Sequence, residues 1–307
     1  MKKMPTGWVD VQVNGCVGVD FTSAELTSDE VLKATEHVLK SGTAVYLPTI
    51  ITAPVERYQR NIPLIRQAIE GAGLTAHVPG VHLEGPFLSA KPGAVGAHNP
   101  DWVQEATMAR FDELLNEHGD YLRLLTVAAD NEGGTGFIAA VTGRGITVSV
   151  GHQLASGAQI HAAAAAGARA ATHVGNGIPN MIHRHDNPIW PILAEDLLTA
   201  MIITDGHHLP DDVIKAIIRA KGVERIVVTS DAAPVAGLPP GSYPLWGNDA
   251  VLEECGLFHD PIKKCLCGSS AMMTDCMDHL LQLDLLTADE LLDVGVRNPL
   301  RLIGLLD

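Results

Sequence analysis

Four polar residues that could hold a metal ion and move a proton stand at the ends of apolar, strand-like segments. Glu84 closes VPGVHLE, His152 follows ITVSVG, His173 ends the segment 168–173, and Asp231 ends IVVTSD. Two imidazoles and a carboxylate are typical ligands of a catalytic zinc site, which leaves one position for water. A further carboxylate can act as the acid/base. These residue types predict metal-assisted hydrolysis, with Glu84, His152 and His173 as ligands and Asp231 as the acid/base.

Each of these residues also has a simpler structural explanation. The chain has 14 histidines, and a single histidine is more often a surface or hydrogen-bonded core residue than a ligand. A buried Glu84 would need a partner of either kind, a metal or a salt bridge. Asp231 could be a helix N-cap, but the sequence after it, AAPVAGLPPG, is a poor helix start. Their joint position at strand ends favours the catalytic interpretation.

The elements that would position these residues are eight short apolar runs. They lie at 7–14, 43–50, 78–84, 122–128, 146–151, 168–173, 199–204 and 226–231. Continuous apolar runs suit strands buried on both faces, and helical patterns between them require parallel pairing through right-handed crossovers. The helical patterns cover 54–71, 101–117, 156–166 and 210–221, and a first helix is expected between Ser28 as N-cap and Gly42.

Eight such units in roughly 250 residues are typical of a (β/α)8 TIM barrel. A doubly wound open sheet is the main competitor, but no helix opens directly after the glycines of GCVG, as a phosphate loop requires. We therefore expect residues 1–307 to form a single barrel domain, with active-site residues at the carboxyl ends of its strands. The Gly- and Pro-rich segment 232–268 is expected to be a long functional loop.

Charge and composition exclude several classes of protein. The net charge of −15, with acidic and basic residues interspersed, argues against a nucleic-acid partner. No apolar run approaches the ~20 residues that cross a membrane, and the start lacks a signal-peptide pattern, which predicts a cytoplasmic protein. Five cysteines in a long chain do not suggest disulfides. Cys255, His259, Cys265 and Cys267 could form a structural zinc site, but C-x-C lacks the usual ligand spacing, which argues against it.

Several motifs in the same order resemble the amidohydrolase superfamily and, within it, the N-acetylglucosamine-6-phosphate deacetylases. The motifs are VDVQVNGCVGVDF, GVHLEGPFLS, GAHNP, SVGHQLA, ATHVGNGIPNMIHR, ITDGHHLP, VTSDAAPVAG and CGSSAMM. Many members carry H-x-H on the first strand as ligands of a second metal, whereas this chain has Gln12 and Asn14. Amides are weak zinc ligands, so these two are vestigial second-metal positions and one divalent metal per subunit is expected.

The resemblance implies the same metal ligands and acid/base, and it adds substrate contacts. His98 would lie near the acetyl carbonyl, and Arg184 and His208 are local cations for a phosphorylated amino sugar. The full set of implied substrate contacts is Ala97, His98, Asn176, Gly177, Arg184, Asp205, Gly206, His207, His208, Leu266, Cys267 and Gly268. Some phosphate contacts in the family come from a neighbouring subunit, so a homodimer is implied.

The resemblance also implies a metal-dependent barrel that lacks most or all of the family's small β domain. That domain is built from both chain ends, whereas the first predicted strand here starts by about residue 7 and the chain stops at RNPLRLIGLLD. Zinc is the expected metal, and two imidazoles and a carboxylate also suit iron, cobalt or manganese. Two alternatives stay open: deacylation of another N-acyl amino sugar or amino acid, and a non-catalytic barrel that binds an acylated sugar.

Overall fold

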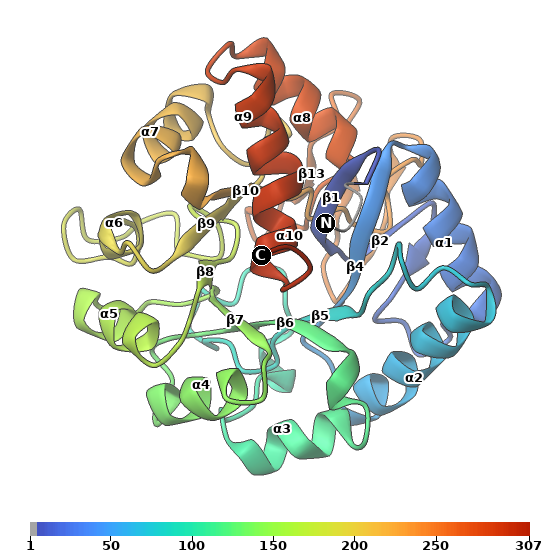
Figure 1. The fold of residues 1–307 in the computed structure, drawn as a ribbon, viewed down its shortest axis with the longest axis horizontal. Coiled ribbons are helices and arrows are strands. Elements are labelled where there is room, and N and C mark those ends of the chain that lie inside the picture. Colours follow the sequence, from blue (N-terminus) through green and yellow to red (C-terminus); the bar gives the residue numbers. More distant parts are fainter. Residues whose placement is uncertain (1–4) are drawn as a thin grey trace.

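The computed structural model describes residues 5–307, and its centre is a ring of eight parallel strands (Figure 1). The strands are β1 (Trp8–Val13), β4 (Thr43–Ile51), β5 (Val81–Glu84), β6 (Leu122–Val127), β7 (Thr147–Val150), β8 (Ala170–Ala171), β9 (Thr199–Ile202) and β10 (Ile226–Val228). They pair in chain order. The ring closes where Val13 bridges Ala232 in parallel and the Asn14 amide N–H donates to the Ala232 carbonyl over 2.8 Å.

The eight strands coincide with the eight apolar runs of the sequence, and the predicted (β/α)8 barrel is confirmed. Most strand residues are buried, because one face points into the barrel and the other lies under the helices. The α-helices of the described residues are α1 (Ser28–Lys40), α2 (Val55–Gly71), α3 (Met108–Leu115), α4 (Gly134–Thr142), α5 (Gly157–Ala165), α6 (Ile189–Ala194), α7 (Asp211–Lys221), α8 (Met273–Gln282), α9 (Ala288–Leu292) and α10 (Asn298–Leu302).

Helix α1 begins one residue earlier than the sequence suggested. Its N-cap is Thr27 rather than Ser28, and the Thr27 side chain accepts from the backbone N–H of Glu30. The Glu30 carboxylate in turn accepts from the Thr27 N–H over 2.9 Å, which completes a capping box. Gly42 follows the helix with φ +93°, a left-handed conformation that glycine adopts without strain.

Other helices differ from the sequence patterns in length and number. The pattern at 101–117 forms only α3, preceded by the 3-10 turn η1 (Pro100–Trp102). Helices α4 and α6 were not predicted, because α4 is apolar on most sides and α6 has six residues. The remaining short turns are η2 (Gly119–Tyr121), η3 (Val223–Arg225) and the π-helical η4 (Asp293–Arg297). No helix within residues 5–307 is long and apolar enough to cross a membrane.

The amino-terminal end of the barrel is filled by the last helices of the chain. Val296 of η4, Leu300 of α10 and Ile303, which follows α10, pack against inward-facing residues of the strands. These are Val9, Val11, Val45, Leu47, Leu124, Ala170, Met201 and Val227. In Figure 1 the red C-terminal helices cross the centre of the ring. One end of the barrel is thus an apolar plug, which leaves the carboxyl ends of the strands for polar residues.

The segment 232–268 is more ordered than the expected long loop. It contains an antiparallel sheet of four short strands, β11 (Gly241–Ser242), β12 (Val251–Leu252), β13 (Phe258–Asp260) and β14 (Cys265–Leu266). A small apolar cluster of its own stabilises it, with Phe258 and Cys267 buried. The remaining two strands, β2 (Gly15–Cys16) and β3 (Val19–Asp20), form a hairpin. Among residues 5–307, the Cys255, His259, Cys265 and Cys267 positions do not form a possible metal-binding group.

Candidate active site

Three of the four chemically suggestive residues follow their strands in a left-handed backbone conformation. His152 has φ +49°, His173 has φ +31° and Asp231 has φ +53°, whereas Glu84 is the last residue of β5. Non-glycine residues rarely adopt positive φ, and such conformations persist where the surrounding structure holds them at functional sites. Here they turn three side chains away from the strand direction and into one mouth of the barrel.

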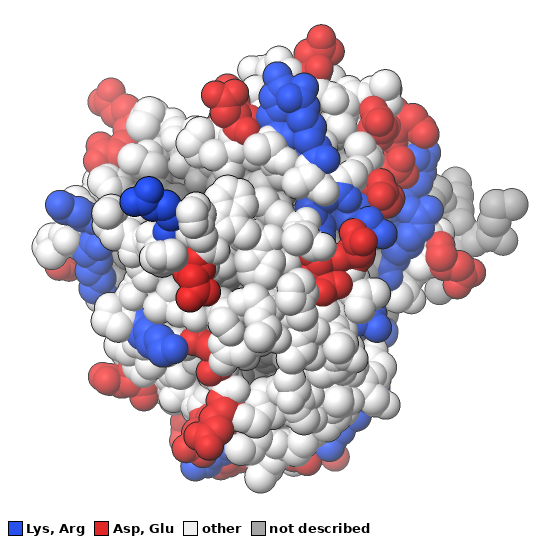
Figure 2. All heavy atoms as spheres, turned by 90° about the vertical axis from the view of Figure 1, so that its left-hand side faces the viewer, with Lys and Arg blue, Asp and Glu red and all other residues white. Residues whose placement is uncertain are grey.

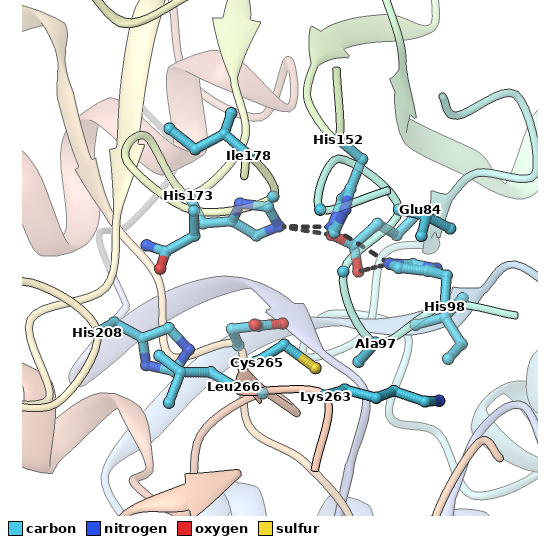
Figure 3. Close-up of a pocket in the computed structure, with 18 of the residues that line it drawn as sticks. Glu84, Ala97, His98, His152, His173, Ile178, His208, Lys263, Cys265 and Leu266 are labelled. Carbon is cyan, nitrogen blue, oxygen red and sulfur yellow. Dashed lines mark hydrogen bonds and ion pairs between the residues drawn. The ribbon is translucent and has the colours of Figure 1, made fainter. Parts of the chain in front are cut away.

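These side chains meet over very short distances (Figure 3). The His173 Nε2 atom lies 2.8 Å from Glu84 Oε1 and 3.1 Å from His152 Nε2, and the His152 Nε2 atom lies 3.2 Å from the same carboxylate oxygen. His98 approaches from the loop after β5, with its Nε2 atom 3.2 Å from His152 Nε2 and 3.7 Å from Glu84 Oε2. All four residues are at most 6% exposed. Three imidazole nitrogens and one carboxylate therefore face one point.

Hydrogen bonds on the far side of each ring distinguish His152 from His98. The Nδ1 atom of His152 lies 2.8 Å from the Ala94 carbonyl, which only accepts, so Nδ1 carries the proton and Nε2 presents a lone pair. The Nδ1 atom of His98 instead accepts from the Thr52 backbone N–H over 3.3 Å. Burial and the neighbouring His152 lower the pKa of His98 to about 3. His98 is therefore neutral, and its proton lies on Nε2.

The donor set fits a divalent cation. Distances alone group Glu84, His98 and His152 as a possible metal-binding set, but a protonated Nε2 cannot be a ligand, which favours His173 over His98 as the third member. Burial opposes ionisation of Glu84, yet the His152 and His173 imidazoles beside it hold its pKa well below the usual range. Burial also disfavours charge on His173, and Glu84 nevertheless raises its pKa. The centre therefore favours a positive charge beside Glu84.

Asp231 lies beside this centre and is held by two amides from β1 and the residue after it. Gln12 Nε2 and Asn14 Nδ2 donate to the same Asp231 oxygen, Oδ1, over 2.8 and 2.7 Å. No residue in the described part of the chain donates to Oδ2, so that oxygen is free to accept a proton. Burial, followed by the charge of Glu84, raises the pKa of Asp231 to about 6.

The loop after β9 contributes a second group of polar residues, centred on Asp205 and His208. His208 Nδ1 lies 2.8 Å from Asp205 Oδ2, and Ser269 Oγ donates to the same oxygen over 2.6 Å. The backbone N–H groups of His207 and His208 donate to Asp205 Oδ1, each over 2.9 Å. Burial opposes its ionisation, but the His208 hydrogen bond lowers the pKa of Asp205. The ionised Asp205 thus fixes the His208 ring, which lines the cavity.

The cavity above these residues has a volume of about 580 Å³, within the usual range for small-molecule sites. It contains the predicted metal and acid/base residues, and seven of the predicted substrate contacts line it: Ala97, His98, Asn176, Gly177, His208, Leu266 and Gly268. The other five predicted contacts, Arg184, Asp205, Gly206, His207 and Cys267, are not among its lining residues. Arg184 is exposed on the loop between β8 and α6.

Several lining residues were not anticipated from the sequence. Lys263, Lys264 and Trp246 come from the small sheet and its loops. The Lys263 ammonium donates to Asn248 Oδ1 over 2.6 Å and to the Gly247 carbonyl over 3.0 Å. Lys263 and Lys264 are adjacent in the long loop of an acidic chain, and this local positive charge is a sequence signal for an anion-binding position. Trp246 offered none, because its place in the cavity depends on a hydrogen bond from Nε1 to the distant Asp20.

The chain is similar to known deacetylases in sequence and in structure. The human N-acetylglucosamine-6-phosphate deacetylase is 33% identical over 97% of the chain and 74% of the relative, and the Escherichia coli O157:H7 N-acetylgalactosamine-6-phosphate deacetylase is 30% identical over 97% and 77%. The Mycobacterium smegmatis N-acetyl-D-glucosamine-6-phosphate deacetylase superposes with a TM-score of 0.87 at 28% identity, over 98% of this chain and 78% of that one. A mutant of that enzyme has been solved with N-acetyl-D-glucosamine-6-phosphate bound. No protein-family model matches the chain.

Proposed function

Because this chain belongs to the N-acetylglucosamine-6-phosphate deacetylases of the amidohydrolase superfamily, we propose that it hydrolyses the acetamide of N-acetylglucosamine 6-phosphate. The products are glucosamine 6-phosphate and acetate. The observation that carries the proposal is the convergence of Glu84, His152 and His173 beside Asp231 at one cavity. It combines the ligand types of a hydrolytic metal with a carboxylate free to move a proton.

In this proposal Glu84, His152 and His173 hold one divalent cation, and zinc is the expected metal. A bound cation polarises the acetyl carbonyl and makes the attacking water more acidic. Gln12 and Asn14 stand where many members of the superfamily have histidine ligands of a second metal. In this chain their amide nitrogens point at Asp231. Those N–H groups repel a cation, which supports a single-metal site.

Asp231 moves the proton in both halves of the reaction. Its free Oδ2 accepts a proton from the water as the water oxygen bonds to the carbonyl carbon. The same oxygen then delivers the proton to the amide nitrogen as the carbon–nitrogen bond breaks, so that acetate and a primary amine leave. The amides of Gln12 and Asn14 keep Oδ1 occupied, which restricts the transfer to one oxygen.

His98 supplies a hydrogen-bond donor for the acetyl oxygen. Its Nε2–H group faces the centre, because Nδ1 accepts from the Thr52 amide. The negative charge that develops on the acetyl oxygen during attack is stabilised by such a buried, preoriented donor. His98 therefore acts as an oxyanion donor rather than as a ligand.

The phosphate end of the substrate binds between two loops. Asn176 lines the cavity, and its Nδ2 atom is buried without a hydrogen-bond partner among residues 5–307. Gly177 has φ +64° and packs close to His152, so that a side chain there would clash. On the facing loop, Asp205 holds the His208 ring at the cavity wall. Asn176, Gly177 and His208 thus form a polar anion site in the same chain.

A second copy of the chain supplies Arg184 in this proposal. Arg184 is exposed, and its carbonyl accepts from Trp190 Nε1 over 2.7 Å. Large exposed hydrophobic residues follow along this part of the chain: Met181 in the same loop, Trp190 in α6, Leu197 after α6 and Val213 in α7. Figure 2 shows the face over α5, α6 and α7, where the centre has a broad area without charged side chains. Such an area is a candidate interface, and a two-fold dimer would bring the partner's loop near the cavity.

Acetate release from N-acetylglucosamine 6-phosphate, measured beside the unphosphorylated sugar and with bound metal counted, tests the function. We expect one metal per chain and a strong preference for the phosphorylated sugar. N-acetylgalactosamine 6-phosphate is the second candidate substrate, because a deacetylase of that sugar is 30% identical to the chain. Binding of either sugar without acetate release by a metal-loaded protein would indicate a non-catalytic barrel.

A further inference from the structure

Asn14 lies in the active-site cavity with only one half of its side-chain amide satisfied. Its Nδ2 atom donates to Asp231 Oδ1 over 2.7 Å. Its Oδ1 atom is buried and has no hydrogen-bond partner among residues 5–307. The residue is 1% exposed and lines the cavity. A buried acceptor without a partner is unfavourable by itself, and in a native site it calls for an explanation.

The orientation of this amide follows from its neighbours. An ionised carboxylate can only accept hydrogen bonds, so the nitrogens of both Gln12 and Asn14 must face Asp231 Oδ1. The oxygens of both amides therefore point elsewhere, and both are unpartnered within residues 5–307. The two residues differ in one respect: Asn14 lines the cavity, whereas Gln12 is not among its lining residues. Only the Asn14 oxygen is therefore placed to meet a bound molecule.

We propose that Asn14 Oδ1 accepts a hydrogen bond from the N–H of the substrate acetamide. The acetamide has a single donor, its N–H, and burial in the cavity would leave that donor unsatisfied without an acceptor. Asn14 is bonded to Asp231, the residue that must deliver a proton to the same nitrogen. The Asn14 side chain thus binds both Asp231, which carries the proton, and the acetamide nitrogen, which receives it. This arrangement keeps the two groups close together while the carbon–nitrogen bond breaks. This inference rests on the proposed deacetylation.

The simpler explanation is that Asn14 only holds Asp231, as Gln12 does. The chain itself offers the control, because Gln12 and Asn14 each provide one hydrogen bond to Asp231 Oδ1. Asn14→Leu and Gln12→Leu remove those bonds in turn and keep a similar side-chain volume. If both residues only position Asp231, the two variants will affect every acyl substrate alike.

The test compares two substrates that differ only at the scissile bond. One is N-acetylglucosamine 6-phosphate, and the other is the 2-O-acetyl ester of glucose 6-phosphate, in which an oxygen replaces the N–H. We expect Gln12→Leu to lower kcat/KM for the amide and the ester by the same factor. Asn14→Leu should lower kcat/KM for the amide by roughly tenfold more than for the ester, the effect of one lost buried hydrogen bond.

Equal amide-to-ester ratios in wild type, Asn14→Leu and Gln12→Leu would overturn the inference and leave the deacetylase function intact. Failure of the metal-loaded wild type to release acetate from the amide would instead overturn the proposed function. Metal content and thermal unfolding of each variant verify that the site is assembled. If a leucine is not tolerated at either position, the pair Asn14→Ala and Gln12→Ala gives the same comparison of ratios.

Discussion

Replacing His98 by alanine should reduce turnover strongly while the protein keeps its metal. The Thr52 amide donates to His98 Nδ1 over 3.3 Å, so Nε2 carries the proton and cannot bind a cation. His152 is placed similarly close to Glu84 but has the opposite tautomer, because its Nδ1 lies 2.8 Å from the Ala94 carbonyl. His152→Ala should therefore lose metal, whereas His98→Ala should not.

The expected size follows from where His98 lies. Its Nε2 atom is 3.7 Å from Glu84 Oε2 and the residue is 6% exposed, so water cannot replace the missing donor easily. Removal of one buried oxyanion donor typically lowers kcat by about 10²–10³-fold, equivalent to about 3–4 kcal/mol of transition-state stabilisation. His98→Gln, which keeps a side-chain N–H, should recover part of that loss.

Two measurements on the same samples decide the matter: metal per chain by elemental analysis, and kcat for acetate release. Wild type, His98→Ala, His98→Gln and His152→Ala form the set. If His98→Ala loses metal to the same extent as His152→Ala, the tautomer argument fails and His98 belongs to the ligand set. A normal kcat with full metal would reject the oxyanion role instead.

Four further predictions concern other parts of the molecule. Asp231→Asn should keep its metal and lose several orders of magnitude in kcat; near-normal turnover would reject the acid/base role. A mixture of Arg184→Ala and Asp231→Asn subunits should regain activity that neither variant has, if Arg184 acts across a dimer; size measurements that show only monomers would contradict this. Since the pKa of Asp205 is lowered on folding, its charge stabilises the fold at neutral pH, and this contribution is lost as the pH falls below its usual value of 3.8. Asp205→Asn should therefore unfold in less urea than wild type at pH 7 and at pH 4, with a smaller gap at pH 2.5, and a constant gap would argue against this contribution. Leu300→Ala, in the plug at the far end of the barrel, should lower the free energy of unfolding by about 2–5 kcal/mol and leave kcat unchanged.

Much of the barrel could be predicted because its strands are continuous and apolar. A strand buried on both faces leaves a run of Val, Ile and Leu that is readable without a partner, as in IVVTSD before Asp231. Polar residues at the ends of such runs are conspicuous, and parallel strands bring those ends to one mouth. Glu84, His152, His173 and Asp231 were therefore accessible to sequence reasoning.

The small sheet of 232–268 and the C-terminal plug were not predicted, for different reasons. The strands of the sheet have two or three residues, too few for an alternating pattern to appear. The plug helix α10 has five residues, and its apolar side chains fill the barrel interior only because eight distant strands surround it. In both cases tertiary contacts decide the structure, while local preferences are weak.

The sequence by itself determined the barrel and the four residues at its mouth, because strand periodicity and residue type are local properties. The resemblance to the amidohydrolases added the prediction of one metal rather than two, because Gln12 and Asn14 stand where many members carry two histidine ligands. Only the tertiary structure decided what those amides do, which ring nitrogen of His98 carries a proton, and that Arg184 does not line the cavity of its own chain. Each of these depends on a hydrogen-bond partner or a cavity wall formed by residues far away in the sequence. The orientation of a side chain is set by such contacts, and residue type alone does not specify it.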